Sequence, residues 1–133
     1  MRDLLSNVAE EMGIAAATAT TGTQTSAIID LKKYNSACFV IHTHAWTNGT
    51  FTLSVEEGDA AALGDATAAT VANGSLHADS VLVATAANQR IFSGYKGDKR
   101  YVRLTLTAAS AAQGAVVGVD VLEGHPLDAP VTH

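Results

Sequence analysis

The sequence predicts an all-β fold, an antiparallel β-sandwich or jelly-roll-like domain, and three observations support this prediction. Side chains alternate between polar and apolar from position 100 to 107, so that Val102, Leu104 and Leu106 share one face, a period typical of a half-buried strand. About seven such segments follow one another at sandwich-like spacing, with turn residues between them and no strand–helix–strand alternation. A chain of 133 residues is long enough for one such domain but not for two.

The expected strands are separated by recognisable turns. They span residues 26–31, 37–46, 51–57, 81–85, 89–95, 100–107 and 115–122. Asn48-Gly49 separates the second strand from the third, and an Asn-Gly pair favours a two-residue type I′ hairpin. In the resulting register Trp46 and Phe51 form a cross-strand aromatic pair on the buried face.

Both ends of the chain are expected to lie outside the sandwich domain, which we assign to residues 25–122. Residues 1–24 should form a short helix and an arm of small residues, because apolar side chains between positions 2 and 12 recur at helical spacing. Residues 123–133 contain both prolines, and a proline cannot donate a hydrogen bond within a central strand. We therefore expect this segment to be an extended C-terminal tail.

The composition predicts association with neighbouring molecules. Hydrophobic residues make up 47% of the chain, but many are alanine and aromatic residues are only 5%, so the core is thin and we expect a homo-oligomer. The net charge of −5 argues against direct binding of nucleic acid, which requires a basic face. Five of the eight Lys and Arg residues lie between Arg90 and Arg103, so a local basic strip remains available for an acidic partner.

Cysteine usage and hydropathy indicate where the chain is made. Cys38 is the only cysteine, so no intramolecular disulfide can form and a reducing compartment is expected. The cysteine lies in an apolar segment and should be an inert, buried thiol. No apolar targeting segment follows Met1 and no run reaches the length of a membrane span, so we expect synthesis in a cytoplasm and no membrane partner.

Two histidines are the strongest metal-ligand candidates. His42 and His44 lie two residues apart on one strand face, which could supply two imidazole ligands. The predicted register instead packs them beside strand 51–57 at the edge of the core. A third ligand, His77 or Asp79, would have to come from an unassigned loop. The sequence therefore predicts no metal site.

No other constellation predicts catalysis. Glu56, Glu57 and Asp59 form an acidic cluster that lacks the spacing of an EF-hand calcium loop. Glu56 and Glu57 point to opposite faces of a strand, which argues against a paired-carboxylate catalytic site. No nucleophile with its base and no glycine-rich phosphate loop occurs. We therefore expect neither an enzyme nor a bound cofactor.

The basic stretch and the acidic cluster form the candidate interface. Strict alternation places Arg100 on the face of Val102, whereas Tyr101 and Arg103 point outward. Basic residues commonly protect a solvated strand edge, but Tyr and Arg also suit a contact surface that meets acidic residues of a second copy; both interpretations stay open. The candidate residues are Tyr95, Lys96, Lys99, Arg100, Tyr101, Arg103, Glu56, Glu57, Asp59, His125 and Pro126.

Several groups of residues, taken together, form a pattern that resembles a known family. They are Ile29-Asp30-Leu31 with Tyr34 and Ala37, the segment Phe51 to Gly58, the block Gly94 to Arg103 (G-Y-K-G-D-K-R-Y-V-R), Gly114, Leu122 to Pro126, and Ala129-Pro130-Val131. Between residues 29 and 131 this pattern resembles small virion proteins of tailed bacteriophages and prophages. The members that we compare are capsid decoration, or cement, proteins. The N-terminal segment and residues 60–80 have no counterpart in the pattern.

The resemblance implies a structural virion protein, made in the cytoplasm of the host bacterium and located on the capsid surface. Its partner would be the major capsid protein, whose subunits it would bridge as a homotrimer at local three-fold positions. Two alternatives stay open. One is a neck or tail component that forms a larger ring, and the other is a small carbohydrate-binding or hydrolytic β-sandwich, which would show exposed aromatic residues in a cleft.

Overall fold

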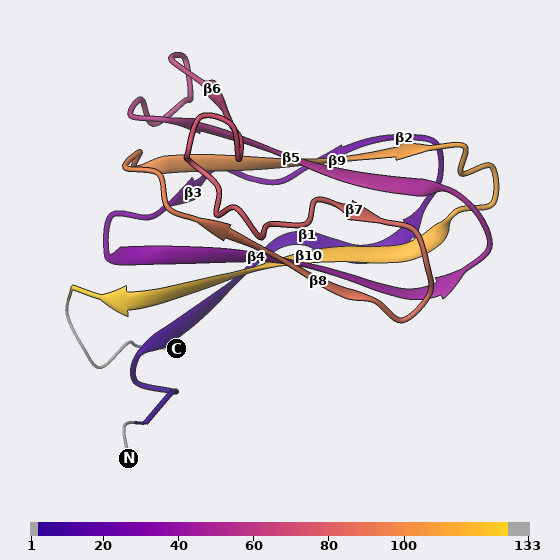
Figure 1. Cartoon of the computed structure of the whole chain (residues 1–133), viewed down its shortest axis with the longest axis horizontal. Coiled ribbons are helices and arrows are strands. Elements are labelled where there is room, and N and C mark those ends of the chain that lie inside the picture. The colour runs from indigo at the N-terminus through magenta and orange to yellow at the C-terminus, as the bar shows by residue number, and fades with distance from the viewer. Residues whose placement is uncertain (1–2, 128–133) are drawn as a thin grey trace.

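The computed structural model describes residues 3–127, and within them the chain forms β-strands and turns only. The strands are β1 (Val8–Ala19), β2 (Gly22–Thr25), β3 (Ile29–Asp30), β4 (Tyr34–Trp46), β5 (Thr50–Gly58), β6 (Thr67–Ala69), β7 (Val83–Ala84), β8 (Arg90–Tyr95), β9 (Tyr101–Ala109) and β10 (Ala115–Pro126). They make two antiparallel sheets stacked face to face (Figure 1). The prediction of an all-β sandwich is confirmed. No helix in residues 3–127 could cross a membrane.

The order of strands shows how the chain alternates between the two layers. The first sheet has the order β1-β10-β4-β8, and the second has the order β2-β9-β5-β6, with β3 also paired to β9 and β7 to β5. The β1–β2, β4–β5 and β9–β10 connections all cross between the sheets at the same end of the sandwich, on the right in Figure 1. The opposite end holds the β3–β4 and β8–β9 turns, and the candidate interface lies there.

Alternating apolar residues from both sheets fill the space between the layers. Phe39 and Ile41 of β4 are fully buried, and so are Phe51 and Leu53 of β5. β9 and β10 add a row of fully or almost fully buried Val and Leu side chains. Each such burial contributes about 1.5–3 kcal/mol, so the interlayer core supplies most of the stability despite the few aromatic residues.

The predicted N-terminal helix is wrong. Asp3 accepts hydrogen bonds from the backbone of Leu5 and Ser6, which closes one turn, and the chain then extends into β1. β1 pairs with β10 from Val8 to Ala19, with two register shifts. Pairing with the long strand β10 gives this segment a ladder of backbone hydrogen bonds, which outweighs weak helix propensity. The apolar residues that suggested a helix, such as Leu4, are largely exposed.

The predicted hairpin at Asn48-Gly49 is also wrong, although the chain does turn there. β4 pairs with β10 and β8, whereas β5 pairs with β9. Trp46 and Phe51 contact each other edge to face, with ring centroids 5.2 Å apart, but across the two layers rather than along one ladder. The reason is that the turn bonds elsewhere: the Asn48 side chain accepts a hydrogen bond from the backbone of Gly114 at 2.9 Å.

The C-terminal tail starts later than predicted. β10 is an inner strand of the first sheet and continues through residues 123–126. Pro126 lies opposite Tyr34 at its last position, beyond Gly124, the final residue paired with β1. A proline is tolerated there because the ladder ends. Ala129, Pro130 and Val131 lie outside the described residues.

Some predicted strands are shorter than expected, and some strands were not expected at all. The first expected strand is reduced to Ile29–Asp30, and β6 was not predicted. The chain also turns at Asn73-Gly74, where the Asn73 side chain accepts a hydrogen bond from the Thr70 backbone and Gly74 has a φ of 83°.

Candidate functional site

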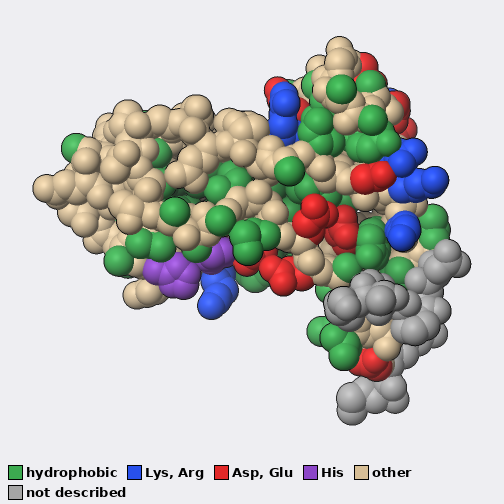
Figure 2. Space-filling model, turned by 180° about the vertical axis from the view of Figure 1, so that it is seen from behind, with side chains coloured by type: hydrophobic (Ala, Val, Ile, Leu, Met, Phe, Trp, Pro, Cys, Tyr) green, Lys and Arg blue, Asp and Glu red, His purple; other side chains and the backbone are tan. Residues whose placement is uncertain are grey.

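Charged residues gather at one end of the sandwich, which we call the charged end. It comprises the β3–β4 turn, the last residues of β5 with the following loop, the β8–β9 turn and the start of β9. Figure 2 shows Lys, Arg, Asp and Glu side chains over this end, to the right in that view, while the opposite end is mostly uncharged. All but three of the candidate interface residues named from the sequence belong to the charged end as defined. Tyr95 is the last residue of β8, directly before the β8–β9 turn, and His125 and Pro126 lie at the end of β10.

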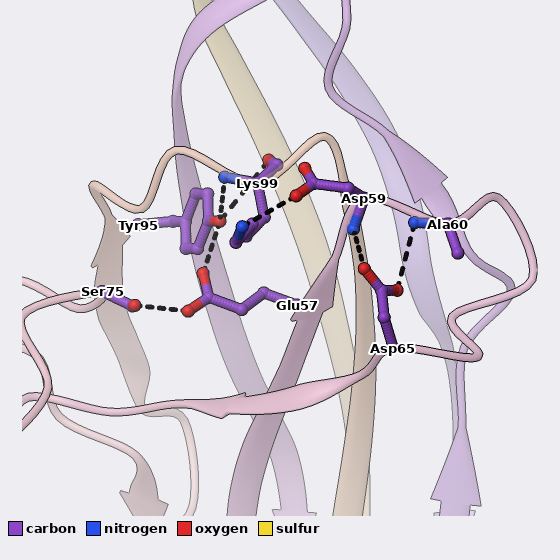
Figure 3. Close-up of polar contacts among 7 residues, drawn as sticks. All are labelled: Glu57, Asp59, Ala60, Asp65, Ser75, Tyr95 and Lys99. Carbon is purple, nitrogen blue, oxygen red and sulfur yellow. Dashed lines mark hydrogen bonds and ion pairs between the residues drawn. The ribbon is translucent and has the colours of Figure 1, made fainter.

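A buried hydrogen-bond network holds the charged end together (Figure 3). The Tyr95 hydroxyl donates to the Glu57 carboxylate at 2.6 Å and accepts from the Lys99 backbone at 3.2 Å. The Ser75 hydroxyl donates to the other Glu57 oxygen. Burial, followed by the bond to Glu57, raises the pKa of Tyr95 well above its usual range. The hydroxyl therefore stays protonated and acts as a fixed donor.

The loop after β5 is tied to the same network from its exposed side. Lys99 forms an ion pair with Asp59, with 2.7 Å between Nζ and Oδ2. The Asp65 carboxylate accepts hydrogen bonds from the backbone of Asp59 and Ala60, as Figure 3 shows. These backbone bonds lower the pKa of Asp65. The acidic cluster is thus part of a hydrogen-bonded turn that holds Asp59 beside Lys99.

The basic side chains of the β9 region pair with acids of the same chain. Arg103 binds Glu56 at 2.6 Å across the β5–β9 ladder. Arg100 binds Asp30 through two parallel hydrogen bonds of 2.8 and 2.7 Å and lies over the Tyr101 ring at 4.7 Å from its centroid. The expectation that the acidic cluster meets the basic residues of a second copy is therefore corrected for Glu56, because Arg103 and Glu56 are direct neighbours on adjacent strands, and for Asp59, which pairs with Lys99 of the same chain.

The predicted facing of the basic strand is partly confirmed. Val102 is fully buried, and Tyr101 and Arg103 alternate with it on the outer face. Arg100 does not join the face of Val102, because it precedes the strand and is exposed. The planar guanidinium group of Arg100 instead binds both oxygens of the Asp30 carboxylate.

A second buried carboxylate was not singled out from the sequence. Glu123 on β10 is 4% exposed, and its Oε1 atom has no hydrogen-bond partner within the described residues. Burial, with nearby Glu11 and Asp30, raises the pKa of Glu123 to about 7. The alternation of β10 could have revealed it, since Glu123 follows Val117, Val119 and Val121 on the inward face.

A cleft of about 360 Å³ opens at the charged end. Its walls come from the β3–β4 turn and the start of β4, including Lys32 and Tyr34, and from the β8–β9 turn, including Asp98 and Lys99. The end of β10 lies next to it, where the Ser36 hydroxyl is 2.8 Å from His125 Nδ1. The cleft is lined by side chains of both signs of charge, whereas small-molecule sites are mostly apolar, so it suits a charged side chain of a protein partner.

Residues outside the predicted set complete the charged end. Asp30 accepts hydrogen bonds from Arg100, and Ser75 donates one to Glu57. Asp65 accepts one from the backbone of Asp59 and so holds the loop after β5. Asp30 belongs to the Ile29-Asp30-Leu31 group that carries part of the resemblance, and this was the available signal. No local pattern indicates Ser75, because β5 and the 70–76 loop meet only in the folded chain.

Arg103→Ala is expected to change the free energy of unfolding by less than about 1 kcal/mol, because both members of the pair with Glu56 are partly exposed. Urea unfolding measures this directly. A loss of several kcal/mol would mean that the pair is structurally essential, and Arg103 would then be unsuitable as a probe of binding.

The histidines lie on the outer face of the first sheet, away from the charged end. The prediction that they pack beside strand 51–57 is wrong, because β4 and β5 belong to different sheets. His42 alternates with the buried residues Ile41 and Thr43, and His44 is exposed. His77 interacts with Asp79. No group of three metal-ligating side chains converges within residues 3–127.

The same outer face exposes apolar side chains. Met12 on β1 is 67% exposed and Phe92 on β8 is 55% exposed. The ladder places them in one row across the sheet, with Asp120 and Val40 between them. The two exposed apolar side chains are therefore separated by a carboxylate and a buried valine and do not form one continuous apolar patch.

No protein-family model and no curated protein matches this sequence. Among solved structures, the chain is similar to the SPBc2 prophage-derived protein YomS, with a TM-score of 0.54 and 10% identity over 90% of this chain and 94% of YomS. It is also similar to the PBSX exported protein XepA, with a TM-score of 0.55 and 17% identity over 94% of this chain. The chain spans only 40% of XepA. At these identities the likenesses show a shared β-sandwich fold.

Proposed function

We propose that this chain is a structural virion protein of a tailed phage or prophage, and specifically a capsid decoration protein that binds the outside of the head and bridges major capsid protein subunits. The observation that carries the proposal is the likeness to a prophage-derived protein over nearly the full length of both chains. It agrees with the family that the G-Y-K-G-D-K-R-Y-V-R block resembles. The protein acts by binding, not as an enzyme.

The charged end is the proposed docking surface. The ion pair with Glu56 holds Arg103 on the outer face of β9, and the Arg100 side chain lies over the Tyr101 ring on the same strand region. Lys33 and Lys96 form no ion pair within the described residues, so positive charge remains for acidic groups of the shell. The adjoining cleft offers a recess for a side chain of the partner. Binding to the shell would then bury the side chains of the charged end in an interface.

Binding to heads tests this proposal. The purified protein is mixed with empty expanded heads of the phage or prophage that encodes it, and co-sedimentation gives the affinity. Saturable binding to heads supports decoration, whereas binding to isolated tails or necks only would contradict it. Native mass of the free protein tests the trimer expected from the resemblance against a larger ring.

Tyr101→Ala and Arg103→Ala are each expected to weaken binding to heads at least about tenfold, because interface Tyr and Arg side chains often dominate affinity. Thr107→Ala is the matched control, since Thr107 lies on the same strand and outer face but away from the charged end. Circular dichroism should be unchanged in all three. If Tyr101→Ala and Arg103→Ala bind like the control, the docking surface lies elsewhere.

A further inference from the structure

The outer face of the first sheet holds two imidazoles whose nitrogens face each other. His42 Nδ1 and His44 Nε2 are 3.3 Å apart, and the two rings meet edge to face with centroids 5.4 Å apart. Figure 2 shows the purple His side chains side by side on this surface. Alternate residues of a strand point to the same side, so β4 itself fixes this arrangement.

A carboxylate orients the first of the two rings. His42 Nε2 lies 3.2 Å from Asp120 Oδ2 on the neighbouring strand β10. An ionised carboxylate only accepts hydrogen bonds, so the neutral His42 ring carries its proton on Nε2. The lone pair of Nδ1 then points toward His44. Histidines that bind metals almost always donate their other ring N–H in this way.

The backbone around the pair is held in place as well. Gly118 lies opposite His42 on β10, and a Cβ there would be 2.6 Å from His42 Cε1, so the glycine lets the ring lie flat on the sheet. Thr43, between the histidines, donates a 2.7 Å hydrogen bond to the Ala86 carbonyl and accepts one of 2.8 Å from the Gln89 backbone. The His42 ring is therefore held by Asp120 and Gly118, and the Thr43 bonds hold the β4 backbone from which both rings project.

We propose that His42 and His44 chelate a divalent transition-metal ion such as Zn²⁺ or Ni²⁺, with Asp120 as the orienting carboxylate. Zinc–nitrogen bonds of about 2.0–2.1 Å in tetrahedral geometry require about 3.3–3.4 Å between two ligand nitrogens, which matches the observed separation. Imidazole pairs suit Zn²⁺, Ni²⁺ and Cu²⁺, whereas Ca²⁺ and Mg²⁺ prefer oxygen. Water completes the coordination.

Binding requires one rearrangement of protons. In the free pair, His44 Nε2–H donates to His42 Nδ1. When the metal binds both nitrogens, the His44 proton moves to Nδ1 of the same ring, and His42 keeps its proton on Nε2 toward Asp120. This inference replaces the sequence-based expectation of no metal site, whose register placed the histidines against the core. It does not depend on the proposed virion function.

Isothermal titration of the full chain with Zn²⁺ and separately with Ni²⁺ tests the site. We expect one ion per chain, and at least about tenfold weaker binding in His44→Ala and Asp120→Asn, since loss of an orienting partner typically costs 10–100-fold. His77→Ala is the matched control and should bind like the parent, because His77 faces Asp79 elsewhere. Ca²⁺ should not bind detectably.

A further variant adds a result of opposite sign. Arg90 lies opposite His42 on β8, and its positive charge opposes a bound cation. Arg90→Gln should therefore tighten Zn²⁺ binding, an outcome that a purely structural role of the histidines would not produce. The proposal is overturned if the parent does not bind Zn²⁺ or Ni²⁺, or if His77→Ala weakens binding as much as His44→Ala. His44 is exposed, so its replacement should leave the fold intact, as circular dichroism will show.

Discussion

Gly114→Ala is expected to destabilise the protein on the order of 3–5 kcal/mol. Gly114 has a φ of 69°, and a Cβ at this position would overlap the carbonyl oxygen of Ala19 at the end of β1. The same residue accepts a 3.0 Å hydrogen bond from the Thr47 backbone and donates one to the Asn48 side chain. Its displacement would therefore disturb all three connections that cross between the sheets.

Urea unfolding of Gly114→Ala and of Gly74→Ala separates the cost of the steric overlap at Gly114 from the cost of the backbone conformation. Gly74 also has a positive φ, 83°, but nothing lies within 4 Å of a Cβ placed there. Its replacement should cost only about 1–2 kcal/mol, the penalty of the left-handed conformation. Equal losses of stability in the two variants would show that Gly114 is needed for its backbone angle alone. The connections that cross between the sheets would then tolerate a displacement of Gly114.

Glu123→Gln is expected to stabilise the protein at pH 8 by about 3 kcal/mol and to have little effect near pH 4. The folded-state pKa of Glu123 is about 7, above its usual value of 4.5. Between these values the unfolded chain ionises while the folded chain keeps its proton. Stability is therefore lost as the pH rises from about 4.5 to 7, by about 1.4 kcal/mol per pH unit, and Gln removes this loss.

Glu57→Gln is the matched control, because Glu57 is equally buried but accepts hydrogen bonds from Tyr95 and Ser75. Removing its charge should destabilise the protein by about 1.5–3 kcal/mol at pH 8. Chemical denaturation from pH 4 to 8 compares the variants. If Glu123→Gln shows the same pH dependence as the parent, the buried carboxylate does not titrate in this range.

Side-chain alternation predicted the long strands β4, β5, β9 and β10, but it carries no information about which strands pair. β4, β5, β9 and β10 all have an apolar inward face, and this was visible in the sequence. The Asn48-Gly49 turn looks the same whether the chain returns in one sheet or crosses to the other. Here the choice depends on hydrogen bonds to Gly114, a residue far away in the chain. The helix error has a similar origin, since pairing with β10 overrides the local signal.

Many residues of the charged end could be predicted from the sequence, but their pairing within one chain could not. The basic block and the acidic cluster were identified as counterparts by composition and charge, and the fold does bring Arg103 beside Glu56. The pairing is within one chain because β5 and β9 are adjacent, which only the topology determines. Glu123 and Asp120 were missed as site residues because their importance depends on what faces them across the fold.

Quantitative mass spectrometry of purified virions tests the central claim most directly. The virions come from the phage or prophage that encodes this chain, and the measurement is the copy number of the chain relative to the major capsid protein. A decoration protein should be present in a fixed proportion to the major capsid protein and should be lost when the heads are removed. Absence of the chain from virions, or only the few copies of a neck or tail ring, would contradict the account.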